Sequence, residues 1–142
     1  MTNLASSGVA FSRSHVAVYW ASTILVAAEL GLGGAWDVSR IPVVRGVVID
    51  RLGYPTYFLV ILGVWKLLGA VALLIPRFPR LKEWAYAGAF FAYTGAVASH
   101  LSVGDFPAGE LVLLIVMTGL TIVSWALRPP SRRDLSWSWP QG

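Results

Sequence analysis

Long apolar runs separated by short polar stretches dominate this chain. Four runs have the length of a membrane-spanning helix, which needs about 20 mostly apolar residues. They cover residues 16–35, 54–75, 84–103 and 108–127. Pro76 and Pro79 interrupt the helical pattern after the second run, and the sequence from Gly104 to Pro107 predicts a tight turn before the fourth. The pattern predicts an all-α integral membrane protein, a bundle of four transmembrane helices that forms a single domain over residues 1–142.

A shorter segment, residues 37–53, separates the first two runs and is too short and too polar to span a bilayer. Its apolar residues recur at helical spacing, and its arginines fall elsewhere on the turn. These apolar residues are Ile41, Val44, Val47, Val48 and Leu52. The segment is therefore predicted to be a short amphipathic helix at the membrane surface. It can act as a lid over the mouth of the bundle or as a plain connector, and the sequence favours neither.

The basic residues predict the orientation of the bundle. With four spans, the N-terminus, the second loop and the C-terminus share one side of the membrane. That side holds Arg13, Arg77, Arg80, Lys82, Arg128, Arg132 and Arg133, seven residues, against three on the other side, Arg40, Arg45 and Arg51. Because loops rich in Lys and Arg stay in the cytoplasm, both termini are predicted to be cytoplasmic, with residues 128–142 as a cytoplasmic tail.

Composition agrees with a membrane location. The chain is 56% hydrophobic and 13% charged, whereas soluble domains carry about 25% charged residues. We therefore expect a multi-pass protein of the cell membrane. The net charge of +4 comes from residues beside the apolar runs, so these residues are expected to contact lipid headgroups, and nucleic acid is not an expected partner. The absence of cysteine excludes thiol catalysis and thiolate metal sites within the chain.

Two charged residues, Glu29 and Lys66, lie inside the predicted spans. Charges in the bilayer are costly, and they usually pair or serve a function. From the helical rise, Glu29 lies about 20 Å and Lys66 about 15 Å above the cytoplasmic boundary. Their side chains can meet if the first two helices are neighbours, as sequential elements usually are. Two roles are open for a Glu29–Lys66 pair. It can be a purely structural pair that fixes helix register, or it can form part of a site for a polar headgroup.

Further polar residues gather toward the outer side. Tyr93 and His100 share one face of the third helix, and Asp105 and Glu110 follow in and after the outer turn. The outer half of the bundle can therefore collect Glu29, Lys66, Tyr93, His100, Asp105 and Glu110. Candidate catalytic residues are Glu29, Lys66, His100 and Asp105, and candidate substrate-binding residues are Tyr54, Trp65, Tyr93 and Glu110. Two roles are open for His100. Histidine side chains titrate near neutrality, so it can be a proton donor or acceptor. It can equally be an interfacial residue bonded to a loop carbonyl.

A metal site is not expected. The two histidines, His15 and His100, should lie on opposite sides of the membrane, and no metal-binding spacing of histidine or cysteine is present. The chain is thus expected to hold no cofactor of its own, and a quinone is the candidate redox molecule from outside.

Several segments resemble the DoxX-like family. They are Leu52-Gly53-Tyr54-Pro55, Gly63-Val64-Trp65-Lys66-Leu67-Leu68-Gly69, the stretch of residues 75–88, and Ser99-His100-Leu101. The resemblance covers roughly residues 16–127 and implies a small four-helix membrane protein, with Lys66, Glu83 and His100 matching the family pattern. The wider DoxX/DoxD grouping includes a subunit of a thiosulfate:quinone oxidoreductase, members of redox-stress complexes, and relatives that act as membrane chaperones or cargo receptors. Fold resemblance implies function only by analogy.

Three functions are compatible with these features. The first is an intramembrane polar pocket for a lipophilic small molecule, for example in a quinone-linked redox subunit. The second is a membrane enzyme that performs acid–base chemistry, such as isomerisation, cyclisation or epoxide opening, on a lipophilic substrate. The third is a non-catalytic chaperone or assembly factor. The expected partners are membrane lipid, a lipophilic small molecule, and either a second copy of the chain or a redox partner protein.

Overall fold

The computed structural model describes residues 12–133, and within that range it is helical, with no strand. Four long helices form the body of the molecule. They are α1 (Arg13–Ser39), α3 (Thr56–Leu74), α4 (Pro79–Val103) and α5 (Ala108–Ala126). Three short segments complete the described chain: α2 (Pro42–Arg45), the π-helical η1 (Gly46–Arg51) and α6 (Pro130–Arg133).

The helix ends follow from local sequence. Ser12 caps α1 by accepting a hydrogen bond from the backbone N–H of His15. Pro55 and Pro107 directly precede α3 and α5, and Pro79 occupies the first turn of α4, where its missing N–H costs nothing. Gly104 ends α4 with a φ of 70°, a left-handed conformation that glycine adopts without strain. The predicted runs therefore locate all four long helices to within a few residues.

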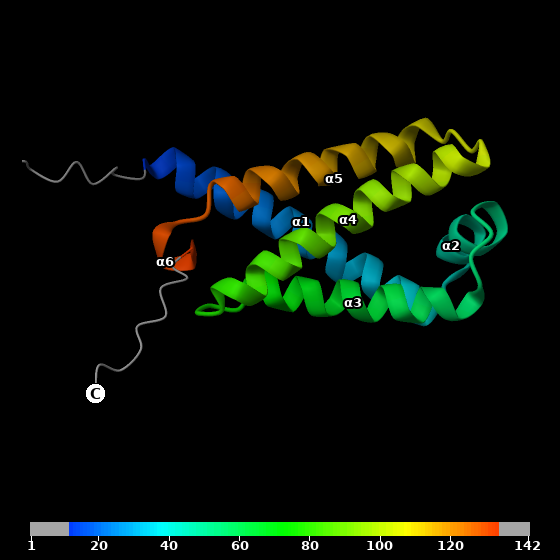
Figure 1. The fold of residues 1–142 in the computed structure, drawn as a ribbon, viewed down its shortest axis with the longest axis horizontal. Helices are drawn as coiled ribbons and strands as arrows, with labels where there is room; N and C mark the ends of the chain where they lie inside the picture. Colours follow the sequence, from blue (N-terminus) through cyan, green and yellow to red (C-terminus); the bar gives the residue numbers. More distant parts are fainter. Residues whose placement is uncertain (1–11, 134–142) are drawn as a thin grey trace, which may run out of the picture.

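The four long helices lie side by side in an elongated bundle (Figure 1). α1 packs against both α3 and α5, while α4 runs diagonally, from beside the end of α3 to beside the start of α5. α1 begins and α5 ends at one end of the bundle, and α2 with η1 lies at the other. The predicted amphipathic segment is thus present as a short helical piece, although its first residues belong to α1.

Three helices, α1, α3 and α5, are long and apolar enough to cross a membrane. Their outward residues include many exposed large apolar side chains, such as Ile24, Val64 and Ile115, which suit contact with lipid. α4 is as long as α1 to within two residues, but its polar residues, among them Thr94 and Ser99, make it less apolar. These features indicate an integral membrane protein. The four-span count, the cytoplasmic termini and the single domain stay predictions.

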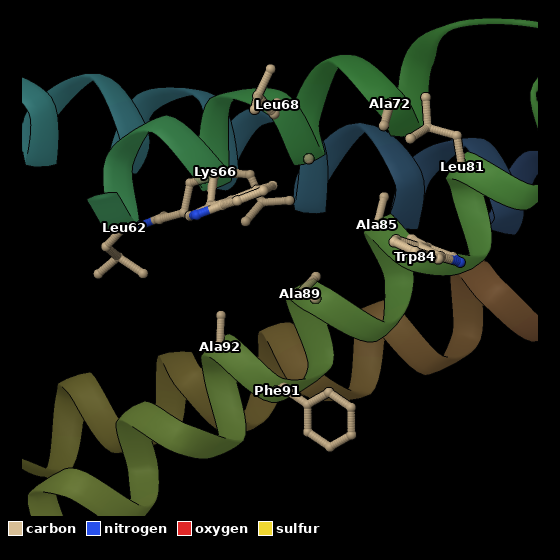
Figure 2. Close-up of a pocket in the computed structure, with 14 residues that line it drawn as sticks. Leu62, Lys66, Leu68, Ala72, Leu81, Trp84, Ala85, Ala89, Phe91 and Ala92 are labelled. Atoms are coloured by element: carbon tan, nitrogen blue, oxygen red, sulfur yellow. The ribbon is translucent and has the colours of Figure 1, made fainter. Parts of the chain in front are cut away.

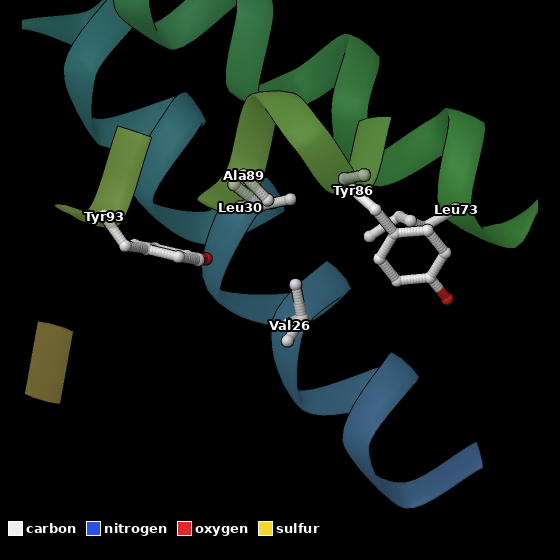
Figure 3. Packing of buried hydrophobic residues seen from close by; sticks show 7 residues of the cluster. Val26, Leu30, Leu73, Tyr86, Ala89 and Tyr93 are labelled. Carbon is white, nitrogen blue, oxygen red and sulfur yellow. The ribbon is translucent and has the colours of Figure 1, made fainter. Parts of the chain in front are cut away.

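A buried apolar cluster joins three helices at the centre of the bundle (Figure 3). It consists of Val26 and Leu30 from α1, Ala70 and Leu73 from α3, and Tyr86, Ala89 and Tyr93 from α4. Tyr86 and Tyr93 reach from α4 toward α1, and their hydroxyl groups find partners there or nearby. Tyr86 bonds to Ser124 Oγ of α5 at 2.7 Å, as a buried phenol requires.

α1 and α3 approach so closely that glycine is required at the crossing. A Cβ on Gly63 would lie 2.6 Å from the carbonyl oxygen of Gly34, and one on Gly34 would lie 2.9 Å from the carbonyl oxygen of Gly63. Both distances are shorter than a side-chain carbon tolerates. Small residues at such crossings are the usual means by which membrane helices come into backbone contact.

The opposite end of α3 is closed by a buried lysine. Lys82 Nζ donates hydrogen bonds to the carbonyl oxygens of Ala72 and Leu73, both at 2.9 Å, and to that of Ile75. Ala72 and Leu73 belong to the last turn of α3, and Ile75 is its C-cap residue. Carbonyls at this end lack partners within the helix, so an ammonium there satisfies them and suits the negative end of the helix dipole. The predicted tail begins with α6, and residues 134–142 lie outside the described residues.

Candidate ligand groove and polar clusters

Lys66 lies at the centre of a polar cluster between α1, α3 and α4. Its ammonium nitrogen is 3.2 Å from Glu29 Oε1 and 3.4 Å from Asp37 Oδ2. Tyr93 of α4 donates its hydroxyl hydrogen to the other carboxylate oxygen of Glu29. The predicted Glu29–Lys66 pair is therefore confirmed, and it belongs to a larger group that includes a second carboxylate.

The spacing along α1 explains how one lysine reaches two acids. Glu29, Gly33 and Asp37 follow one another at intervals of four and so share one face of the helix. A Cβ on Gly33 would overlap Lys66 Nζ, so glycine at this position leaves the space in which the ammonium lies. Within residues 12–133, Asp37 Oδ2 is buried and accepts no hydrogen bond, and its only charged partner is Lys66. The cluster thus holds two carboxylates against one ammonium.

An apolar groove opens beside this cluster, between α3 and α4 (Figure 2). Its volume is about 570 Å³, within the range of small-molecule sites. The lining residues are Leu30 of α1; Leu62, Trp65, Lys66, Leu68, Gly69 and Ala72 of α3; and Leu81, Trp84, Ala85, Gly88, Ala89, Phe91 and Ala92 of α4. Ala85, Ala89 and Ala92 project from α4 into the space that faces α3. Among the described residues, Lys66 is the only charged one in this lining.

A second polar cluster ties the segment between α1 and α3 to the turn between α4 and α5. Arg51, the last residue of η1, donates to Asp105 Oδ2 from Nε at 3.0 Å and from Nη2 at 2.6 Å, and to Glu110 Oε1 from Nη1 at 2.8 Å. His100 contacts the same two carboxylates, with Nδ1 2.9 Å from Asp105 Oδ2 and Nε2 3.6 Å from Glu110 Oε2. Since a carboxylate only accepts, His100 Nδ1 carries the hydrogen.

The charges in this second cluster change the acidity of Asp105. Desolvation alone would raise the pKa of the Asp105 carboxyl, but the hydrogen bonds from Arg51 and His100 and their charges outweigh it, so the pKa lies below its ordinary value of 3.8. Asp105 is therefore ionised at neutral pH and available to hold Arg51.

The predicted site residues fall into two separate groups. Glu29, Lys66 and Tyr93 come together, with Trp65 beside them in the lining of the groove. His100, Asp105 and Glu110 form the other group. No hydrogen bond or ion pair joins the two groups within residues 12–133. Tyr93 and His100 share a face of α4, as predicted, but seven residues separate them by about 10 Å along the helix.

Tyr54 belongs to neither group. It bonds through its hydroxyl to Ser99 Oγ at 2.7 Å and stacks on Phe58 with ring centroids 4.4 Å apart. Glu83, one of the family-pattern residues, accepts from Trp125 Nε1 at 2.8 Å and pairs with Arg128, which makes it a link between α4 and the end of α5. The catalytic and substrate-binding roles assigned to the predicted residues stay predictions. In residues 12–133, no group of three histidine or acidic side chains could hold a metal ion.

Sequence reasoning missed Asp37 and Arg51 as members of the clusters. Asp37 follows the first apolar run, a position that predicts a connector, but α1 continues past it to Ser39. Its interval of eight from Glu29, with glycine midway, is the signal that places it on the same helix face. Arg51 was placed on the outer side without a partner, although Asp105 and Glu110 were predicted for the same side.

Comparison with known proteins identifies the family. No curated protein and no solved structure matched the chain. The family model for the DoxX-like family matches residues 21–128, which include all four long helices except the first turns of α1, and it agrees with the resemblance seen in the sequence. The chain therefore belongs to the DoxX-like family.

Proposed function

We propose that this protein binds a lipophilic small molecule within the membrane, in the groove between α3 and α4, with the polar part of the ligand at Lys66. The groove is the observation that carries the proposal, because it combines an apolar volume of small-molecule size with a single charged residue at one position of its wall. Binding sites in proteins usually have this composition, apolar walls with few polar groups that fix orientation.

The proposal requires α4 to cross the bilayer together with the three apolar helices. Its 25 residues correspond to about 37 Å of helix, more than the roughly 30 Å of hydrocarbon. Its polar side chains turn inward: Tyr86, Tyr93 and His100 are all buried, whereas Trp84 and Phe91 are 80% and 69% exposed. A helix of this kind presents mainly apolar side chains to lipid. With four spans, the positive-inside rule then puts both termini in the cytoplasm.

Access from the lipid follows from the rim of the groove. Leu68 of α3 and Trp84 and Phe91 of α4 line the groove and are also exposed. In the membrane these side chains face hydrocarbon, so a lipophilic molecule can enter sideways without first crossing water. This distinguishes the groove from the second cluster, which lies among loop and helix-end residues.

Proton transfer at the same site is a second candidate function, and one observation favours it. Tyr93, Glu29 and Lys66 form a continuous set of hydrogen bonds, with both an acid and a base beside the groove. Such a set can serve isomerisation, cyclisation or epoxide opening, or it can deliver protons to a quinone that receives electrons from a partner protein. Ligand binding in the groove is a precondition for each of these, whereas a chaperone role does not need the groove.

The test uses two variants with the same chemical change on the same helix. Gly88 lines the groove, and Gly95 does not. A Cβ at either position meets nothing within 4 Å, so the backbone leaves room to start a side chain at both, but only at Gly88 does leucine enter the groove. The purified protein in nanodiscs is exposed to a photoreactive alkyl ketone, and labelled peptides of α3 and α4 are quantified.

We expect saturable labelling of the wild-type protein and of Gly95→Leu, and a loss of most of that labelling in Gly88→Leu. Equal labelling of the two variants, or labelling that never saturates, contradicts ligand binding in the groove. Endogenous lipids that copurify with the wild type and Gly95→Leu but not with Gly88→Leu would then identify the natural ligand by mass spectrometry.

A further inference from the structure

The described residues of the groove offer hydrogen-bond donors but no side-chain acceptors. Its lining consists of leucine, alanine, glycine, phenylalanine, two tryptophans and one lysine. Tryptophan and lysine side chains donate hydrogen bonds and cannot accept them. The acceptors of the polar cluster, Glu29 and Asp37, do not line the groove. A ligand in the groove therefore meets polar hydrogens and no lone pairs from side chains.

Lys66 retains donor capacity for such a ligand. An ammonium group has three N–H donors. Within the described part of the chain, that of Lys66 makes one hydrogen bond, to Glu29 Oε1 at 3.2 Å. Its contact with Asp37 is an ion pair at 3.4 Å that does not meet hydrogen-bond geometry. Because the side chain also lines the groove, an acceptor atom of a bound molecule can complete the coordination of the ammonium.

The charge of the cluster limits which acceptors are favourable. With Lys66 protonated and Glu29 and Asp37 ionised, the cluster carries one surplus negative charge, and a proton shared by the two carboxylates makes it neutral. An anionic headgroup adds an uncompensated negative charge in either state, in surroundings where charge is costly. A cationic headgroup would lie against the Lys66 ammonium. An uncharged acceptor avoids both penalties.

Resting on the proposed function, we infer that the ligand of this groove is an uncharged lipid whose polar group is a hydrogen-bond acceptor such as a ketone or ester carbonyl, and that the groove rejects fatty acids, phosphate esters and amines of the same chain length. Lys66 is the residue that donates a hydrogen bond to this acceptor. The discrimination arises largely from the cost that a second buried charge imposes on the wrong ligand.

Four photoreactive probes with one common alkyl tail test this inference. Their heads are a methyl ketone, a carboxylic acid, a primary amine and none. Labelling of the wild-type protein in nanodiscs is measured at neutral pH, where the acid and the amine are charged, and probe amounts are normalised to the fraction partitioned into the lipid. We expect the ketone to reach half-maximal labelling of the groove peptides at a concentration at least about tenfold below that of the acid and the amine.

Variants test whether Lys66 is responsible for the preference for the ketone probe. In Lys66→Met the ketone should label no better than the probe without a head, while Arg45→Met, which removes an exposed positive charge on α2, should keep the wild-type order. Because Lys66→Met leaves two carboxylates without their counter-ion, the double variant Lys66→Met/Asp37→Asn is tested beside it. The comparison of the four probes on the wild-type protein needs no variant.

Failure of the inference differs from failure of the proposed function. If all four probes label the groove equally well, and Gly88→Leu abolishes labelling by each, the groove binds lipophiles but does not select an uncharged acceptor, and the inference is overturned. Preferred labelling by the acid or by the amine overturns it as well. If no probe labels the groove saturably, the proposed function itself is wrong.

Discussion

The two faces of α3 differ in how closely they meet their neighbours. Toward α1, the backbone at Gly63 lies so near Gly34 that a Cβ on either glycine would be too close to the backbone of the other helix. Toward α4, Gly69 lines an open groove, and a Cβ on the facing Gly88 meets nothing within 4 Å. One helix thus has a closed interface on one side and an open one on the other.

This difference shows how a membrane protein can be stable and still offer a binding site. The closed interface fixes α3 against α1 and holds the carboxylates of Glu29 and Asp37 against Lys66 Nζ. α4 runs diagonally past the other face (Figure 1), where the groove opens. Lys66 belongs to both, because its charge is held by the closed interface and its side chain lines the open one.

The largest effect is expected from Lys66→Met, which acts on the closed side. Removal of one partner from a buried ion pair leaves uncompensated charge and costs about 3–5 kcal/mol, and here two carboxylates lose their counter-ion. We expect a corresponding loss in unfolding free energy, measured by denaturant titration of the detergent-solubilised protein with far-UV circular dichroism. Lys66→Met/Asp37→Asn should recover part of the loss. A single variant as stable as Arg45→Met would contradict the account of the cluster.

A smaller loss is expected from Gly63→Ala. The added Cβ would lie 2.7 Å from the backbone nitrogen of Val38 as well as 2.6 Å from the Gly34 carbonyl oxygen. Since neither backbone atom can move aside alone, α1 and α3 must separate. Overpacking of this kind costs about 1–3 kcal/mol, measured in the same titration. Unchanged stability would mean that the two helices are not in backbone contact.

Gly88→Ala is the matched change on the open side and should have the opposite sign. The new methyl group enters free space, and alanine is the better helix former by about 0.5–1 kcal/mol. We expect a slight gain in unfolding free energy for this variant. A loss as large as that of Gly63→Ala would show that α3 and α4 are closed against each other and that no groove exists.

The smallest effect concerns the Arg51 contacts, which lie apart from both faces of α3. The pKa of Asp105 is lower in the folded protein than in the unfolded chain, so its contribution is complete above its ordinary pKa and is lost as the pH falls through the folded value. Because the chain has no cysteine, a fluorophore on Val43→Cys reports on α2 alone. Its anisotropy should fall below about pH 4.

The control for this acid transition is Asp105→Asn. This variant should show lower anisotropy already at neutral pH and a smaller change on acidification, while unfolding of α1 and α3 is unaffected. If the labelled protein shows the same acid transition with and without Asp105→Asn, the effect belongs to Glu110 or to another group.

Sequence patterns predicted the helices well because each depends on local information. Apolar length located α3 and α5 almost to the residue, and the prolines at 55 and 107 marked where they begin. The Glu29–Lys66 pair was also predictable, since its depth follows from helical rise. The place of Asp37 in this cluster was not predictable, because a polar residue at the end of an apolar run predicts a loop.

The groove could not be predicted from the sequence. Ala85, Gly88 and Ala92 make one face of α4 small, and such a face equally suits close packing against another helix. Whether space remains depends on the tilt of α4 relative to α3, which is set by packing against other helices and not by the spacing of residues along the chain. His100 lies about 10 Å further along α4 than Tyr93, so the one predicted site became two clusters.

The most direct test of the account is a high-resolution density map of the wild-type protein in nanodiscs made from native lipid. We expect elongated density between α3 and α4, with a polar end within hydrogen-bond distance, about 3 Å, of Lys66 Nζ, and its absence from the Gly88→Leu protein. A wild-type map in which α3 and α4 meet along their length, with no density between them and Lys66 enclosed by protein alone, would contradict it.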